Sequence, residues 1–381
     1  CGSGWAGGGR SWYLAAMSEV ASEAPVVDLE DIRSGDPARR AKAADALRVG
    51  FGDFGLVYIQ NHGVDTDQLA RFYDELVALF SRPEEEKRTW ARPDIWYQRG
   101  WTPPNTEQAV VAGGQPDFKE CYFAACEPLD SKFRLMFPEI YAENSWPKDA
   151  DTWREDYLAL GRKVHAVGME LLRACALALD LPEDVFSKGT EGGPHVTRAL
   201  WYLPLDATQV GTDILWGEEH TDFNLLTLLP GGQFFDPSGN ACPRPDAESG
   251  LYLRTRESAE HPRGRMVHGK PPAGCIVAQV GQQLEILTGG TYLATPHVIK
   301  APKTPGYTRT AFAHFIHLHS EQKLFPHEKF LTDDVIRAYG PPVLAGTYGL
   351  KTLVDIGLAP KTALEKLGYH HYGRLAAARA G

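Results

Sequence analysis

The stretch GEEHTDFNLLTLLP, residues 217–230, places two polar, metal-binding side chains next to an apolar run. The run at residues 225–229 has the length and composition of a buried β-strand. His220 and Asp222 lie just before this run and are separated by Thr221 alone. Successive side chains of an extended strand alternate between its faces, so we expect these two to project to the same side. The stretch therefore predicts a pair of metal ligands next to a strand.

Further along the chain, PPAGCIVAQVGQQLEILTGGTYLATPHVIKAP, residues 271–302, offers a third ligand. A turn signal opens it, a β-rich run follows at residues 275–280 and continues after Gly281 at 284–287, and Gly289-Gly290 predicts another turn. A strand is then expected to lead into His297. Two imidazoles and one carboxylate that leave coordination positions open suit non-haem Fe(II) oxygen chemistry.

In order and spacing, these motifs resemble the isopenicillin N synthase-like branch of the Fe(II)/2-oxoglutarate-dependent oxygenases. That family shows HTD, a leucine-rich strand, a proline–glycine turn, "GD.L…TNG", a distal His and then Arg-x-Ser. Other segments resemble the family's motifs as well: APVVDLEDI (24–32), GFGDFGLVYIQNHGVD (50–65), FSRPEEEK (80–87), PDFKE (116–120) and RALWYLP (198–204).

The resemblance implies a mixed α and β fold, with a double-stranded β-helix (jelly roll) core flanked by N-terminal and C-terminal helices. It implies that His220, Asp222 and His297 bind Fe(II), although zinc also accepts this ligand set. Arg309 would bind the distal carboxylate of 2-oxoglutarate, with help from Tyr202. With O₂, the enzyme would oxidise a C–H bond of a small organic substrate by hydroxylation, desaturation or cyclisation, releasing succinate and CO₂.

Several positions depart from the family pattern. Ala311 replaces the serine of Arg-x-Ser, Leu200 stands where asparagine is usual, and Gln282 stands where aspartate is usual. The longer interval between the two histidines predicts an insertion within residues 231–270. Because Ala311 cannot donate the usual hydrogen bond, an Fe(II)/O₂ oxidase that needs no 2-oxoglutarate stays open. A jelly-roll binding protein without turnover is a third reading, and Arg309 could instead form a salt bridge within its strand.

The composition of the chain bears on its partners and its location. The chain has 381 residues, is 43% hydrophobic and carries a net charge of −10, so nucleic acid is not an expected partner. No apolar run approaches the roughly 20 residues that cross a bilayer. The six cysteines form no C-x-x-C pair, which favours free thiols and a cytoplasmic location. The oligomeric state stays open.

Four regions are expected along the chain: a disordered extension (1–16), an N-terminal helical and β region (17–140), a long helix with the jelly-roll core (141–330) and a helical tail (331–381). The predicted helices cover residues 39–49, 67–80, 151–181 and, as the best segment of the tail, 362–367. A short strand is predicted at residues 56–60, and a long loop at 90–114.

Some candidates have two interpretations. Four aromatic residues could line a substrate pocket or pack in the core: Trp96, Tyr97, Trp101 and Phe118. His314, His317 and His319 suggest a second metal site, but histidines near a sheet are usually ordinary polar side chains. The charged segment at residues 244–270 could contact an anionic substrate, and a solvated insertion is the simpler interpretation.

Overall fold

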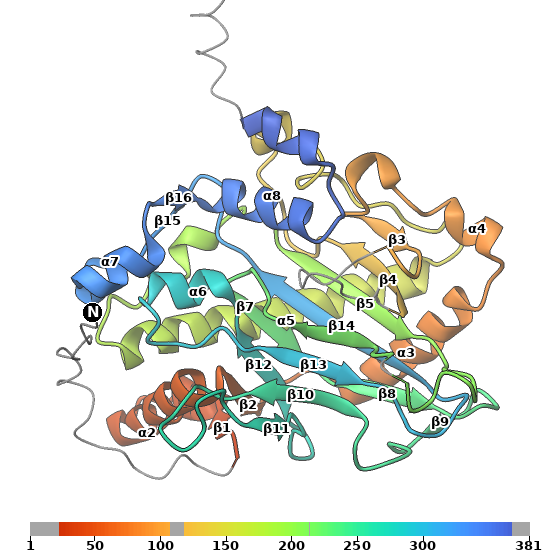
Figure 1. Cartoon of the computed structure of the whole chain (residues 1–381), viewed down its shortest axis with the longest axis horizontal. Helices are drawn as coiled ribbons and strands as arrows, with labels where there is room; N and C mark the ends of the chain where they lie inside the picture. The colour runs from red at the N-terminus through yellow and green to blue at the C-terminus, as the bar shows by residue number, and fades with distance from the viewer. Residues whose placement is uncertain (1–22, 107–117, 213, 368–381) are drawn as a thin grey trace, which may run out of the picture.

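Two β-sheets that pack against each other form the centre of the protein (Figure 1). The computed structural model describes residues 23–106, 118–212 and 214–367. The larger sheet has ten strands, with the order β1-β2-β12-β7-β14-β5-β4-β3 and with β8 and β9 extending it from β14. The smaller sheet has four strands in the order β11-β10-β13-β6.

The strands are β1 (Val26–Asp28), β2 (Leu56–Gln60), β3 (Gly100–Thr102), β4 (Lys119–Ala124), β5 (Val196–Tyr202), β6 (Gly217–His220), β7 (Leu226–Leu229), β8 (Gly232–Phe235), β9 (Ala241–Cys242), β10 (Gly250–Arg254), β11 (Met266–His268), β12 (Ile276–Val280), β13 (His297–Lys300), β14 (Thr308–Ile316), β15 (Lys323–Leu324) and β16 (Val343–Leu344). The helices are α1 (Leu29–Arg33), α2 (Pro37–Val49), α3 (Thr66–Phe80), α4 (Glu84–Arg88), α5 (Asp151–Ala178), α6 (Gln282–Leu287), α7 (Asp333–Tyr339) and α8 (Ala345–Asp355).

The chain passes repeatedly from one sheet to the other. Strands β5, β7, β12 and β14 belong to the larger sheet, whereas β6, β10 and β13 lie between them in sequence and belong to the smaller one. This alternation is the winding of a double-stranded β-helix, so the expected jelly-roll core is confirmed. None of the described helices combines the length and the apolar character that crossing a membrane requires.

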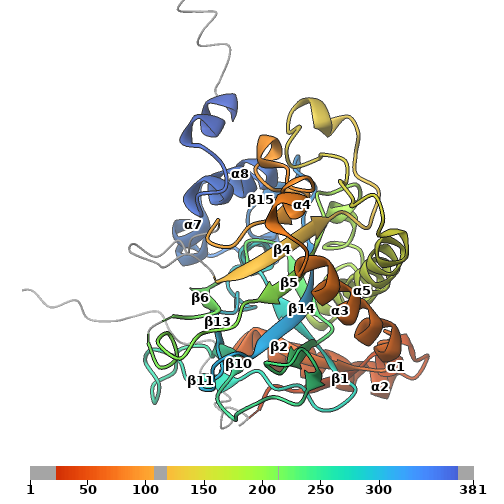
Figure 2. The same ribbon diagram turned by 90° about the vertical axis from the view of Figure 1, so that its right-hand side faces the viewer.

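Helix α5 packs on the outer face of the larger sheet, against β7 and β14 (Figures 1 and 2). Two glycines allow this close approach. A Cβ on Gly161 would lie 2.0 Å from the Cys126 sulfur, and one on Gly168 would lie 2.3 Å from Ile316 Cδ1. The helix ends at Ala178, three residues before the predicted end, and Asp180 then takes a positive φ of 49°.

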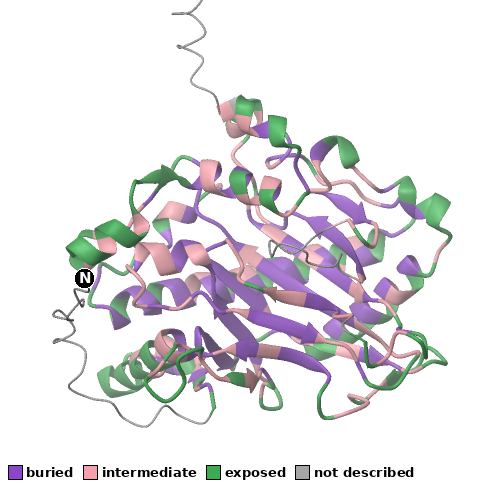
Figure 3. Ribbon diagram, in the orientation of Figure 1, coloured by how far each residue is buried: buried purple, intermediate pink, exposed green. Residues whose placement is uncertain are grey.

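The packing of helices and sheets forms two apolar layers. One lies between the larger sheet and helices α2, α3 and α5, and the other lies between the two sheets. Figure 3 shows the central strands buried and the outer helices exposed on their solvent side. The predicted bounds of α2, α3 and β2 agree closely with this structure. Helix α3 has a clear apolar period, and β2 is a short, continuously buried run.

Other sequence predictions are corrected. The expected opening strand at residues 24–32 is only three residues long, because Asp28 caps helix α1 by accepting a hydrogen bond from Glu30 N–H. Residues 284–287 belong to helix α6, not to a β run. In the tail, residues 362–367 lie in a 3₁₀ helix, and α8 is the longest helix there. The predicted extension at residues 1–16 lies outside the described residues.

The segment at residues 231–270 is a structured part of the core. It contributes β8 and β9 to the larger sheet and β10 and β11 to the smaller one. Strand β10 pairs with β13, which begins at His297. The segment therefore contributes to both sheets. The expectation that residues 244–270 form a solvated insertion is wrong for β10, which is largely buried, whereas residues 259–263 are exposed.

Candidate metal centre and cosubstrate site

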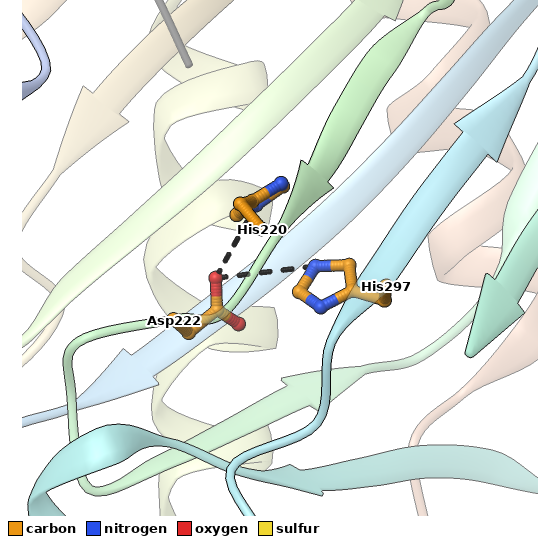
Figure 4. Close-up of side chains that lie close together, drawn as sticks. All are labelled: His220, Asp222 and His297. Carbon is orange, nitrogen blue, oxygen red and sulfur yellow. Dashed lines mark ion pairs between the residues drawn. The ribbon is translucent and has the colours of Figure 1, made fainter. Parts of the chain in front are cut away.

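His220, Asp222 and His297 meet at one end of the smaller sheet (Figure 4). His220 is the last residue of β6 and pairs directly with His297, the first residue of β13. The Asp222 Oδ1 atom lies 3.7 Å from His220 Nε2 and 4.0 Å from His297 Nε2. The strand alternation predicted for His220 and Asp222 does not apply, since β6 ends at His220 and Asp222 belongs to the loop that follows.

Backbone carbonyls fix the orientation of both imidazoles. His220 Nδ1 lies 2.6 Å from the Glu218 carbonyl oxygen, and His297 Nδ1 lies 3.0 Å from that of Thr295. Each Nδ1 therefore carries the proton and donates it, which leaves the Nε2 lone pair directed toward Asp222. A hydrogen bond at the second ring nitrogen is the usual way in which proteins orient a metal-binding histidine.

Two side chains of the larger sheet donate hydrogen bonds to the second carboxylate oxygen of Asp222, Oδ2. Thr227 donates its hydroxyl to Oδ2 at 2.7 Å, and Gln279 donates its amide at 2.9 Å. Burial raises the pKa of Asp222, but the net shift of this pKa is downward, and the hydrogen bonds from Thr227 and Gln279 contribute to the lowering. Asp222 thus remains ionised, with Oδ1 facing the histidines.

The three residues fit a divalent metal ion. Burial lowers the pKa of His297 to about 4, so its imidazole is neutral at pH 7 and can act as a ligand. The three ligand atoms lie within 4.8 Å of one another, and no other group of this kind occurs among the described residues. Two imidazoles and one carboxylate that bind from one side leave the opposite side open for exogenous ligands.

Gln282, which stands where aspartate is usual, supports the loop that carries the carboxylate. Its backbone N–H donates to the Asp222 carbonyl at 2.8 Å, and its side-chain amide donates to the Thr221 hydroxyl at 2.6 Å. Tyr348 of helix α8 donates its hydroxyl to the Gln282 amide oxygen. The longer amide thus links the loop to the C-terminal helix.

The candidate metal centre opens into a cavity of about 600 Å³ between the two sheets. The inner face of the larger sheet forms its floor, and side chains of α8, including Thr352 and Leu353, form part of its wall. Asp222 and His297 lie on the inner side of the candidate metal centre, whereas the His220 side chain is 40% exposed, so the centre is at the mouth of the cavity.

Arg309 and Tyr202 line the same cavity and pair with each other across strands β14 and β5. The Arg309 guanidinium carbon lies 5.5 Å from the Tyr202 ring centroid and 5.8 Å from that of Phe234. Ala311 lines the cavity beside Arg309, as strand alternation predicts. Its cross-strand neighbours are Gly232 and Leu200, which add no polar side chain.

The four aromatic candidates for substrate contact lie elsewhere. Trp96, Tyr97, Trp101 and Phe118 are all absent from the described residues that line the cavity. Trp101 is 1% exposed and donates its indole N–H to Glu120 at 2.6 Å, so it is a core residue. Gln98 and Arg99, which lie between Tyr97 and Trp101 in the sequence, line the cavity instead.

The histidines near the end of β14 do not form a second metal site within the described residues. His314 Nε2 lies 3.0 Å from His165 Nδ1 of helix α5, and His314 Nδ1 lies 2.8 Å from the hydroxyl of Thr197 on the neighbouring strand β5. His317 lines the cavity, and burial lowers its pKa to about 3. His319 lies 3.5 Å from Asp130.

Sequence reasoning missed Thr227, Gln279 and Arg244. Thr227 and Gln279 lie inside apolar strand segments, where a buried polar side chain is itself a signal that it has a specific partner. Arg244 lies in the segment that was expected to be solvated, and it lines the cavity. Only the pairing of β8 with β9 brings it there.

Comparison with known proteins agrees with this geometry. Residues 24–149 match the family model described as non-haem dioxygenase in morphine synthesis N-terminal. Kihadalactone A synthase LFS from Citrus sinensis is 27% identical over 290 residues, 72% of this chain and 78% of that protein. A 1-aminocyclopropane-1-carboxylate oxidase from Dictyostelium mucoroides is 22% identical over 337 residues, 80% of this chain and 84% of that protein.

Solved structures give the same result. A 2OG-Fe(II) oxygenase family protein from Caulobacter crescentus superposes with a TM-score of 0.69 at 25% identity, over 87% of this chain and 98% of that chain. A full-length Neurospora crassa protein in complex with alpha-KG has a TM-score of 0.68 at 20% identity, over 86% of this chain and 95% of that chain. The chain is therefore related to the Fe(II)- and 2-oxoglutarate-dependent oxygenases, in agreement with the resemblance of its sequence motifs.

Proposed function

We propose that the protein is a non-haem Fe(II)- and 2-oxoglutarate-dependent dioxygenase that oxidises a C–H bond of a small organic molecule. The observation that carries this proposal is the convergence of two Nε2 lone pairs and one carboxylate oxygen at the end of a cavity with an arginine on its wall. Iron, 2-oxoglutarate and O₂, when bound, supply an oxidative decarboxylation to succinate and CO₂ that is coupled to oxidation of the substrate.

The chain's own residues bind and orient these groups. His220, Asp222 and His297 would hold Fe(II) on one side only, which leaves room for the cosubstrate and O₂. Arg309 would hold the distal carboxylate of 2-oxoglutarate, since a guanidinium offers a planar fork that matches a carboxylate. The walls of the cavity would hold the substrate's C–H bond near the metal and limit access of water.

The substrate side of the cavity is largely apolar. Its lining includes side chains from the loop before α5, from the loop after β6, from α8 and from the segment that follows α8, namely Ile140, Phe223, Leu353, Ile356 and Leu358. A small molecule with a sizeable apolar portion fits this surface. The thiols among the described residues are all free, which is compatible with the proposed cytoplasmic location.

One anaerobic experiment separates this function from its two rivals. Protein is titrated first with Fe(II) and then with 2-oxoglutarate, and the weak visible charge-transfer absorption of the chelate is recorded. A band that disappears in the His297→Ala variant supports the dioxygenase. Iron binding without a band would favour the oxidase that Ala311 keeps open, and no iron binding would favour a binding protein without turnover.

A further inference from the structure

Arg309 and Arg244 both line the cavity, and they lie close enough for their charges to interact. Arg309 pairs with Phe234 of β8, and Phe234 pairs with Cys242 of β9, so these three residues form one row across the larger sheet. Arg244 follows Cys242 by two residues and lines the same cavity as Arg309. The segment that resembles a solvated insertion in sequence therefore brings a second guanidinium to this wall.

Contacts with the smaller sheet hold Arg244 in place. Its Nη1 donates to His268 Nε2 at 2.5 Å. The His268 ring is stacked on Tyr252, with ring centroids 4.6 Å apart and an interplanar angle of 3°. Burial, followed by the charge of Arg244, lowers the pKa of His268, so this imidazole is a neutral acceptor. Arg244 is thus anchored to β10 and β11 while it lines the cavity.

Among the residues that the structure describes, neither guanidinium has a carboxylate partner. No ion pair in these parts of the chain joins Arg244 or Arg309 to an acidic side chain, and the Asp246 carboxylate instead accepts hydrogen bonds from backbone N–H groups, including that of Ser249. Burial lowers the pKa of Arg244, and the charge of Arg309 lowers it further. Two neighbouring like charges on the wall of a cavity favour an anionic ligand between them.

Ala311 stands where the family motif has serine, so no hydroxyl at position 311 can contact an anionic ligand. Ala311, Gly232 and Leu200 adjoin one another across strands β14, β8 and β5 and offer no hydroxyl or amide group. A carboxylate that reached Arg309 would therefore find no donor on these three side chains. Arg244, two residues beyond the end of β9, adds a guanidinium to the lining of the same cavity.

We propose that Arg244 binds the distal carboxylate of 2-oxoglutarate together with Arg309 and replaces the hydrogen bond that Ala311 cannot make. This inference rests on the proposed function. It assigns a cosubstrate-specificity role to the β8–β10 segment: two guanidinium groups at the far end of the site favour a 2-oxo acid that carries a second carboxylate over one that does not.

The test measures binding, not turnover. Fe(II)-loaded protein under anaerobic conditions is titrated calorimetrically with 2-oxoglutarate and, separately, with pyruvate, which lacks the distal carboxylate. In Arg244→Gln we expect the Kd for 2-oxoglutarate to rise roughly tenfold or more, since a charge-assisted hydrogen bond is lost. The Kd for pyruvate should stay within about twofold of wild type, and Arg244→Lys should lie between the two proteins.

A matched control is Arg263→Gln, since Arg263 is an exposed arginine of the same segment that does not line the cavity. Wild-type affinity for 2-oxoglutarate in Arg244→Gln, alongside a loss in Arg309→Gln, would overturn the role of Arg244 and leave the proposed function intact. An equal loss for both acids would also overturn it, because the distal carboxylate would not be the group recognised. Failure of the wild-type protein to bind 2-oxoglutarate would contradict the proposed function itself.

Discussion

Replacing Thr227 with valine tests whether the larger sheet sets the geometry of the metal ligands. The Thr227 side chain belongs to a residue that is 1% exposed, and its hydroxyl donates to Asp222 Oδ2 at 2.7 Å. Valine has nearly the same shape but no donor, so the carboxylate would keep only the Gln279 amide at that oxygen. A lost hydrogen bond to a charged group costs about 1.5–3 kcal/mol.

That range corresponds to a loss of roughly ten- to hundredfold in metal affinity, which is also typical when a residue that orients a metal ligand is changed. Anaerobic calorimetric titration with Fe(II) measures it directly. Thr310→Val is the matched control, because Thr310 is a buried threonine of β14 whose hydroxyl donates to the Gln233 carbonyl and not to the site. A folded Thr227→Val protein with wild-type iron affinity would refute this reasoning.

Three further outcomes are expected. Arg309→Gln should raise the Kd for 2-oxoglutarate by roughly ten- to hundredfold in the anaerobic titration, and an unchanged Kd would remove this role from Arg309. Gly161→Ala should lower the free energy of unfolding by about 1–3 kcal/mol, because the alanine Cβ would lie 2.0 Å from the Cys126 sulfur. This cost exceeds the gain from the better helix propensity of alanine. Unfolding in urea measures the change, and a variant of equal or greater stability would contradict the prediction. Burial lowers the pKa of His165 to about 4 and that of His317 to about 3, against about 6.5 in an unfolded chain. The unfolded chain therefore binds more protons below pH 6.5, so the stability of the metal-free protein should fall as the pH is lowered from about 6.5 toward 4; a midpoint of thermal unfolding that is constant over this range would argue against it.

The periodic elements of the fold could be predicted from the sequence. Helix α5 and strand β2 depend mainly on local apolar patterning, and their predicted bounds lie within three residues of the observed ones. Residues 284–287 show the limit of such reasoning. Four apolar or charged residues after a strand are compatible with either a helix or a further strand. The structure has a helix here, which begins after Gly281 and buries Leu284.

The proximity of His220, Asp222 and His297 can be predicted from residue types and order, but the predicted reason for it is wrong. His220 and Asp222 do not share one face of a strand, because β6 ends at His220. The carboxylate is positioned instead by hydrogen bonds from β7 and β12. Such contacts depend on how the two sheets pack, and no local pattern in residues 217–230 contains that information.

The position of Arg244 shows the same limit on a longer scale. A charged segment rich in turn residues resembles a surface insertion when only its composition is considered. The pairing of Cys242 with Phe234 brings this segment back over the cavity. Long-range strand pairing, not local propensity, therefore decides that Arg244 lines the cavity.

The most direct test of the central claim is a crystal structure of the protein grown anaerobically with Fe(II), with diffraction data collected on both sides of the iron absorption edge. We expect one anomalous peak at about 2.1 Å from His220 Nε2, His297 Nε2 and an oxygen of Asp222. An iron peak bound elsewhere, or no peak among these three side chains in fully iron-loaded protein, would contradict it.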